Sequence, residues 1–220
     1  IGSVATQFGI LGDDEGSGYD RVDILFSEYN YDLMFNVNKQ LTDDLSLDGV
    51  FGINIRNESY SYLRNSTAGG LAIPNIFALS NSLSSNPKPI ESLREKQVNG
   101  YYAQASLGYK NILYLDLTDR IDVSSALPSE NNSYNYYAAS SSLIFSKLVD
   151  IEWLDFGKFR AGYAEVGNDL PPGNVMDTYE TGPNFANASL FSYGSTKNNA
   201  DLKPERTKEF EVGLEAKMFN

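Results

Sequence analysis

The sequence predicts an all-β fold built from antiparallel strands, and three observations support this class. Aromatic residues make up 13% of the 220 residues, with tyrosine the most frequent of them at 15, and such side chains favour sheet surfaces. Several segments alternate apolar and polar residues, which is the period of a strand with one dry and one wet face. No run of about 18 apolar residues occurs, so no segment has the composition of a membrane-spanning helix.

The first two strands are predicted to form a hairpin. Apolar residues occupy the odd positions from Tyr29 to Val37, with mainly polar residues between them. A turn-like segment at 40–44 follows, and a second strand alternates from Leu45 to Ile55. Two alternating segments joined by a short polar turn are typical of adjacent antiparallel strands.

The later strands repeat this pattern with different clarity. A third strand runs from Tyr101 to Tyr109, and a tight turn near Asn111 leads into a fourth through Leu113, Leu115 and Leu117. A fifth strand around 134–145 alternates poorly because its centre is serine and alanine, and a sixth at 158–166 is intermediate. The last strand alternates most clearly, with apolar residues at the even positions from Phe210 to Met218. We therefore expect about seven strands, each with an apolar and a polar face.

The lengths of these strands suit a bilayer. Tyr101 and Tyr109 lie eight residues apart, roughly 27 Å along a strand at about 3.3 Å per residue. A strand tilt near 40° converts this to roughly 20 Å of height, close to the apolar band of an outer-membrane barrel. We expect the odd residues from Tyr29 to Val37 and from Leu113 to Leu117, and the even ones from Phe210 to Met218, to face lipid.

The connections between strands distinguish a membrane barrel from a soluble sandwich. Two very long links are predicted, at Arg56–Gly100 and Gly167–Glu209, and shorter links lie between them. Long outer loops that alternate with short periplasmic turns are typical of a transmembrane barrel, and both long links would then emerge on the same, outer side. Trp153 would lie in a link on the short side, where an indole anchors at the headgroup level; an ordinary buried tryptophan is the alternative.

Composition narrows the function classes. Cysteine and histidine are both absent, which removes Ser/His and Cys/His catalysis and leaves only scattered carboxylates, so no enzyme and no cofactor are predicted. The net charge of -12 has the wrong sign for binding nucleic acid. We expect the acidic residues to keep the loops and the lumen of the barrel solvated, and a specific cation site is the alternative. The acidic run at 13–15 lacks the ligand spacing of a calcium loop, so no metal is assigned to it.

Four segments carry a resemblance to a known family. Residues 198–207, Asn-Asn-Ala-Asp-Leu-Lys-Pro-Glu-Arg-Thr, followed by Glu209, Glu211 and Gly213, resemble the loop-to-strand signature of TonB-dependent receptors. Three others resemble motifs of the SusC/RagA branch: Gly69–Pro74 with Ser80–Ser82, Asp119–Ser125, and Lys158–Tyr163 with Gly167–Asn168. The order of all four matches that branch, whereas Val123 stands where the family has glycine.

The resemblance implies that residues 1–220 are part of the β-barrel domain of a TonB-dependent receptor, about seven strands of an expected 22-stranded barrel, with the plug domain absent from this chain. It implies import of a glycan or peptide nutrient across the outer membrane of a Gram-negative bacterium of the Bacteroidetes. The implied partners are a SusD-like surface lipoprotein, TonB acting through the missing plug, the oligosaccharide or peptide substrate and the lipid bilayer.

The expected outer loops carry the candidate contact residues for substrate or lid. The aromatic candidates are Tyr60, Tyr62, Tyr179, Phe185, Phe191 and Tyr193, with packing among the loops as the alternative role. Arg64 is the basic candidate, and Lys88 and Arg94 are further cations for acidic substrates or the lid, with a solvated surface position as the alternative role for each. A secreted all-β binding module or adhesin is the alternative function, since it would share the tyrosine-rich strands and the acidic charge.

Overall fold

The computed structural model describes residues 2–7, 18–182, 185–186 and 188–219. The chain divides into two compact units, one made of Ile1–Tyr29 and Asn57–Lys96, the other of Asn30–Arg56 and Gln97–Asn220. Among the described residues, no helix has the length and apolar character needed to cross a membrane. The acidic run at 13–15 lies outside the described residues.

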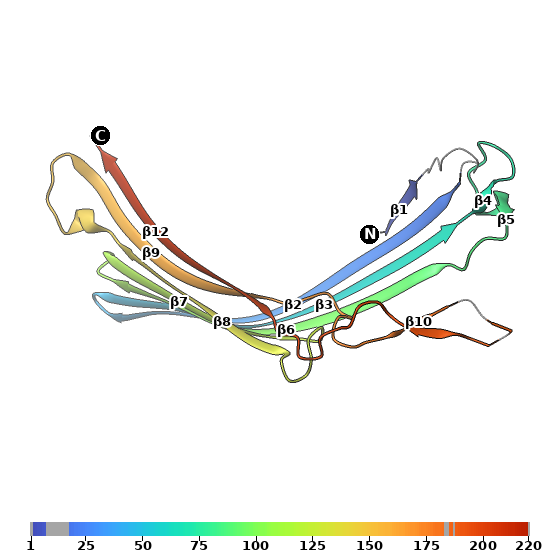
Figure 1. The fold of residues 1–220 in the computed structure, drawn as a ribbon. Coiled ribbons are helices and arrows are strands. Elements are labelled where there is room, and N and C mark those ends of the chain that lie inside the picture. Colours follow the sequence, from blue (N-terminus) through green and yellow to red (C-terminus); the bar gives the residue numbers. More distant parts are fainter. Residues whose placement is uncertain (1, 8–17, 183–184, 187, 220) are drawn as a thin grey trace. The chain divides into compact units, whose positions relative to one another are not determined.

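The described part of the chain forms one eight-stranded sheet with the strand order β1-β2-β3-β6-β7-β8-β9-β12, whose strands are labelled in Figure 1. The bounds of these strands are β1 Gly2–Gln7, β2 Asp20–Thr42, β3 Leu45–Ser66, β6 Ile90–Tyr109, β7 Leu113–Ser124, β8 Ser133–Leu143, β9 Leu154–Asn168 and β12 Glu205–Met218. Two small hairpins pair β4 (Ala68–Leu71) with β5 (Ser82–Ser84) and β10 (Tyr179–Thr181) with β11 (Phe191–Tyr193). The predicted all-β antiparallel fold is confirmed.

Several strands are longer than predicted. β2 begins at Asp20 and β3 runs on to Ser66, while β6 begins at Ile90, so the link expected at Arg56–Gly100 is largely strand. β1 was not predicted at all. The extension of β3 from residue 57 to 66 carries polar side chains at both odd and even positions. Backbone pairing needs no apolar face, so alternation underestimates a strand that is wet on both sides.

Two turns of the second unit match their predicted positions. β2 and β3 are joined by residues 43–44, and β6 and β7 by residues 110–112. Lys110 and Asn111 have φ angles of 51° and 55°, and the Ile112 amide donates to the Tyr109 carbonyl over 2.9 Å. Two consecutive positive φ angles are typical of the type I′ turn, whose twist matches that of a hairpin.

In the first unit, Asn81 holds the segment that carries the Gly69–Pro74 motif. Its side-chain amide donates to the carbonyls of Ile73 and Ile76 over 2.8 and 2.7 Å, and its Oδ1 accepts from the Ile73 amide over 3.0 Å. Gly69 and Gly70 have φ angles of 68° and 94°, where residues with a Cβ are strained. The motif therefore builds a fixed loop between β4 and β5.

The core of the second unit is small and lies where β7 meets the link to β8. Its buried residues are Val98, Asp122, Ser124, Ala126, Leu127 and Tyr134. Most large apolar side chains of the sheet are exposed; Leu33 and Leu214, for example, keep 71% and 72% of their surface. A single sheet has no second layer to cover them, so its apolar side chains face outward rather than into a core.

Candidate functional site

Strand register places the alternating residues of the second unit on two distinct faces. Directly paired residues point to the same side of a sheet, and residues two apart along a strand do so as well. Leu117 pairs with Ala105 and Ala139, Ala139 pairs with Tyr163, and Tyr163 pairs with Phe210. The odd residues of β6 to β9 therefore share one face with the even residues of β12.

This shared face is mainly apolar across β6, β7, β8, β9 and β12, apart from Ser141 at its centre and charged residues such as Asp119 and Glu165. It carries Tyr101, Ala103, Ala105, Leu107, Tyr109, Leu113, Leu115, Leu117, Tyr137, Ala139, Leu143, Phe159, Ala161, Tyr163, Phe210, Val212, Leu214 and Ala216. The predicted grouping of Leu113–Leu117 with Phe210–Met218 is confirmed up to Ala216, and a register shift follows between Lys217 and Met218. Contact of this face with lipid stays a prediction.

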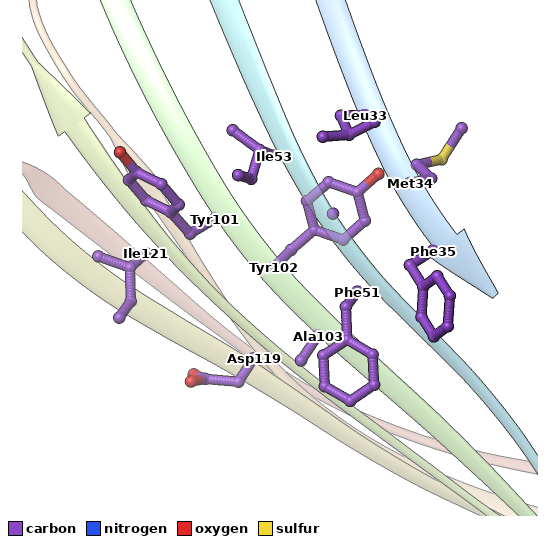
Figure 2. Close-up of a pocket in the computed structure, with 11 residues that line it drawn as sticks. Leu33, Met34, Phe35, Phe51, Ile53, Tyr101, Tyr102, Ala103, Asp119 and Ile121 are labelled. Atoms are coloured by element: carbon purple, nitrogen blue, oxygen red, sulfur yellow. The ribbon is translucent and has the colours of Figure 1, made fainter. Parts of the chain in front are cut away.

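The apolar face contains a hollow. Figure 2 shows that the side chains of Leu33, Phe51, Ile53, Tyr101 and Ile121 come from neighbouring strands. The hollow that they line has a volume of about 610 Å³. The only ionisable groups of its lining are Asp119 and two tyrosines. A substrate site usually has several polar groups that converge on the ligand and orient it. This hollow has few of them, so we interpret it as a depression in an exposed apolar surface rather than as a substrate site.

The opposite face is polar and carries paired charges. On β7, the Asp116 carboxylate accepts from the hydroxyls of Ser106 on β6 and Ser140 on β8. On β9 and β12, Arg160 donates to Glu211 over 3.0 Å, and both side chains are exposed. Exposed pairs of this kind contribute at most about 1 kcal/mol each, so this face suits contact with water.

A small groove on the polar face explains why the fifth strand alternates poorly in sequence. Ala138, Ser140, Gly162 and Ala164 line its floor, with Asp116, Glu209 and Glu211 among its other residues, and its volume is about 240 Å³. Small side chains on β8 and β9 leave this space open. The serine and alanine residues that obscure the alternation in sequence therefore form the groove in the polar face.

Tyr102 anchors the polar face near the end of β7, where it pairs with Arg120. Its ring lies over Gly52, where an added Cβ would come within 2.2 Å of the ring, and the Arg120 guanidinium lies 5.6 Å from the ring centroid. Arg120 also donates to Asp122 over 2.8 Å, and the Tyr136 hydroxyl donates to the same carboxylate over 2.7 Å. Alternation marked Arg120 only as polar, and it gave no sign of these partners.

Two of the family-like motifs meet at the loop-side end of β7. Ser124, the most deeply buried of the described side chains, donates its hydroxyl hydrogen to Asp169, just after β9. The Tyr134 ring occupies the space beside Gly167, where a Cβ would come within 2.6 Å. Asn131 donates to the Asp201 carbonyl over 3.4 Å. The links at 125–132 and 169–204 thus leave the sheet at the same end.

Tyr60, Tyr62 and Arg64 lie on β3 rather than in a loop, which corrects their predicted setting. Arg64 is exposed and donates to Asp20 on β2 over 2.6 Å, while both tyrosines are half-buried. Lys88 is exposed in the link that precedes β6, and Arg94 is exposed on β6. The cause of the correction is the polar extension of β3, which the pattern of alternation did not reveal.

The other aromatic candidates lie on or beside the β10–β11 hairpin. Tyr179 and Tyr193 are directly paired, with ring centroids 4.9 Å apart, and Phe191 lies on the same side of the hairpin. All three are more than half exposed, as is Phe185 in the turn. The Tyr179 hydroxyl donates to that of Tyr193 over 3.2 Å, and this hydrogen bond raises the pKa of Tyr179. The structure brings these residues together as one aromatic surface, but Tyr60, Tyr62 and Arg64 belong to the other unit.

Trp153 lies in the link before β9 and is 49% exposed, so the alternative of a buried tryptophan is wrong. Its ring stacks on Phe219, with centroids 6.1 Å apart, and its carbonyl accepts from the Phe219 amide over 3.2 Å. Within the described ranges, no group of three or more carboxylates has the arrangement of a metal site.

Comparisons with known proteins place this fold. The family model for "TonB dependent receptor-like, beta-barrel" matches residues 3–220, and comparison with curated proteins returns no match. Structures of the RagAB peptide importer in the closed-closed state and of the RagAB peptide transporter each give a TM-score of 0.81 at 19% identity. The importer in the open-open state gives 0.79, also at 19% identity.

In all three comparisons, the match covers 93% of this chain and 23% of the other. The chain thus spans less than a quarter of the length of the solved chains that it resembles. Their likeness in fold agrees with the resemblance to the SusC/RagA branch, and the family match extends over almost all of the sequence. The chain belongs to the TonB-dependent receptor-like β-barrel family.

Proposed function

We propose that this chain forms part of the wall and outer loops of a transporter that imports a peptide or an oligosaccharide across the outer membrane of a Gram-negative bacterium of the Bacteroidetes. The observation that carries the proposal is the division of one sheet into an apolar and a polar face across β6 to β12. A barrel wall needs this division because lipid meets one side of it and water meets the other.

The exposed apolar face favours this function over a secreted binding module or adhesin. Phe210 and Leu214 each keep 72% of their surface, and Leu33 and Phe35 keep 71% and 67%. Soluble proteins rarely expose large continuous apolar patches, because such patches associate in water. In a bilayer the same side chains are solvated by acyl chains.

The rest of the transporter would supply what this segment lacks. β12 lies at an edge of the sheet, and an open edge strand requires a neighbour in a stable barrel. We place the remaining strands, the plug and the contact with TonB in other parts of the complete polypeptide. The polar face, with Arg160, Glu211 and Asp116, would line the lumen beside the plug.

The aromatic surface of the β10–β11 hairpin would contact the substrate or a SusD-like lipoprotein lid. Tyr179, Phe191 and Tyr193 present exposed rings on one side of a short hairpin, which suits stacking on a sugar or on an apolar peptide side chain. Phe185 would extend this surface at the turn. Tyr60, Tyr62 and Arg64 would contact the substrate or the lid from the outer part of the barrel wall, on β3.

The proposal is tested by uptake in a strain that lacks the chromosomal transporter. The complete protein, expressed in that strain, should restore uptake of labelled oligopeptides or oligosaccharides only when TonB is functional. A variant with Tyr179, Phe191 and Tyr193 replaced by serine should insert normally and take up less substrate. Uptake that persists without TonB, or recovery of the complete protein in soluble form without detergent, would contradict the proposal.

A further inference from the structure

We infer that Arg206 and Lys208 form a binding site for the phosphate groups of an outer-leaflet lipid, on the apolar face at the loop-side end of β12. This inference rests on the proposed membrane location. Lys208 pairs with Glu165, and Phe210, two residues further along, pairs with Tyr163. The register therefore puts both cations on the same face as Phe210, Val212 and Leu214.

Arg206 and Lys208 each contact one oxygen of the Glu165 carboxylate. Arg206 Nη1 lies 3.0 Å from Glu165 Oε2, and Lys208 Nζ lies 3.2 Å from Glu165 Oε1. The Tyr163 hydroxyl donates to Oε1 over 2.6 Å. The Glu165 side chain is only 4% exposed, whereas those of Arg206 and Lys208 are 46% and 63% exposed. The carboxylate is thus enclosed, whereas both cations remain accessible from outside.

The charge of this cluster is opposite to that of the chain as a whole. Two cations share one carboxylate, which leaves one unit of positive charge on a chain whose net charge is -12. Asp119, two strands away on β7, also lies on this face, where its carboxylate accepts from the Asn135 amide. Arginine and lysine donate strong, charge-assisted hydrogen bonds to phosphate oxygens, so the positive cluster suits an anionic headgroup.

The height of the cluster matches the position of a headgroup. Lys208 and Met218 lie ten residues apart on β12, roughly 33 Å along the strand and roughly 25 Å in height at a tilt near 40°. An apolar band of about 25 Å would therefore end at Lys208. Just below it, the rings of Tyr137 and Tyr163 lie 5.9 Å apart, as expected of an aromatic girdle at an interface.

The occupant that fits is a lipid rather than a soluble anion. The cations adjoin exposed apolar side chains of the same face, Phe210 above all, so a ligand here would meet acyl chains on one side and water on the other. Headgroup phosphates of a phosphorylated glycolipid occupy that boundary, while free phosphate gains nothing from the apolar neighbours. Basic residues close to a membrane surface attract anionic headgroups by charge.

The test uses the complete transporter in nanodiscs of zwitterionic lipid that contain either bis-phosphorylated lipid A or its dephosphorylated form. Native mass spectrometry measures the retained glycolipid. We expect retention of the phosphorylated form, and a loss of about fivefold for each cation removed in Arg206→Gln and Lys208→Gln. The matched control is Lys158→Gln with Arg160→Gln, which removes two cations from the polar face and should leave retention unchanged.

A second variant separates lipid binding from a purely structural role. Glu165→Gln removes the carboxylate that competes for both cations, so it should retain the phosphorylated lipid at least as well as the parent. Equal retention of the two lipid forms by the parent, equal loss in the control, or loss in Glu165→Gln would overturn the inference. Displacement by millimolar inorganic phosphate would also overturn it, since the site would then take a soluble anion. A protein that inserts but shows no phosphate preference refutes only this inference, whereas failure to insert refutes the proposed function too.

Discussion

Charge on the apolar face of β12 should block assembly, whereas loss of charge on its polar face should not. Leu214 pairs with Phe159 on the apolar face and keeps 72% of its surface, and its neighbour Glu215 pairs with Lys158 on the polar face. Leu214 lies six residues from Lys208 and four from Met218, roughly 15 and 10 Å in height at the same tilt, which is near the middle of the band.

The expected magnitudes follow from these positions. Leu214→Arg should destabilise the inserted barrel by roughly 2 to 4 kcal/mol, the cost of a basic residue near the bilayer midplane. Glu215→Gln removes an exposed carboxylate opposite Lys158 and should cost less than about 1 kcal/mol. The two residues are adjacent in sequence, so differences in local backbone stability cannot account for a contrast between them.

Both substitutions would be made in the complete transporter. Heat-modifiable electrophoretic mobility in extracted membranes measures the folded fraction, and nutrient-dependent growth provides the second assay. If Leu214→Arg folded and inserted like the parent while Glu215→Gln failed, the assignment of the faces would be wrong.

Three further predictions follow from other contacts. Gly52→Val should destabilise the second unit by about 1 to 3 kcal/mol, because the valine Cβ would overlap the Tyr102 ring. In chemical denaturation, adding Tyr102→Ala should restore part of the lost stability. If no stability were restored, the contact between Tyr102 and residue 52 would be contradicted. Tyr193→Phe should lower the pKa of Tyr179 in a spectroscopic titration, because the hydrogen bond that raises this pKa is lost. The same hydrogen bond stabilises the hairpin below the pKa of unfolded tyrosine, near 10. Its contribution disappears as pH rises through the higher pKa of Tyr179 in the folded hairpin. In an otherwise cysteine-free complete transporter, Lys88→Cys and Lys197→Cys should react with an impermeant thiol reagent on intact cells. Asp44→Cys should react only after the cells are permeabilised. If only Lys197→Cys reacted on intact cells, the two long links would not lie on the same side of the membrane, and the prediction would be wrong.

The sequence was most informative where the two faces of a strand differ in polarity. Phe210–Met218 and Leu113–Leu117 alternate because one set of side chains lies on the apolar face and the other on the polar face. It was less informative along residues 57–66 and 90–100, where both faces of the strand are polar and alternation disappears, although backbone pairing continues. Tyr60 and Tyr62 lie in such a stretch of β3, where the lack of alternation predicts a loop. The aromatic candidates are therefore split between this strand and the β10–β11 hairpin.

By itself the sequence determined the all-β class, a turn within 40–44, a tight turn near Asn111, and the faces of the clearest strands, because these depend on local periodicity and on turn chemistry. Only the tertiary structure decided which charges meet. Arg206 and Lys208 on β12 meet Glu165 on β9, and Tyr136 on β8 meets Asp122 on β7, through the register between neighbouring strands. Register is set by pairing across the whole sheet, and a shift of one residue would move each of these side chains to the other face.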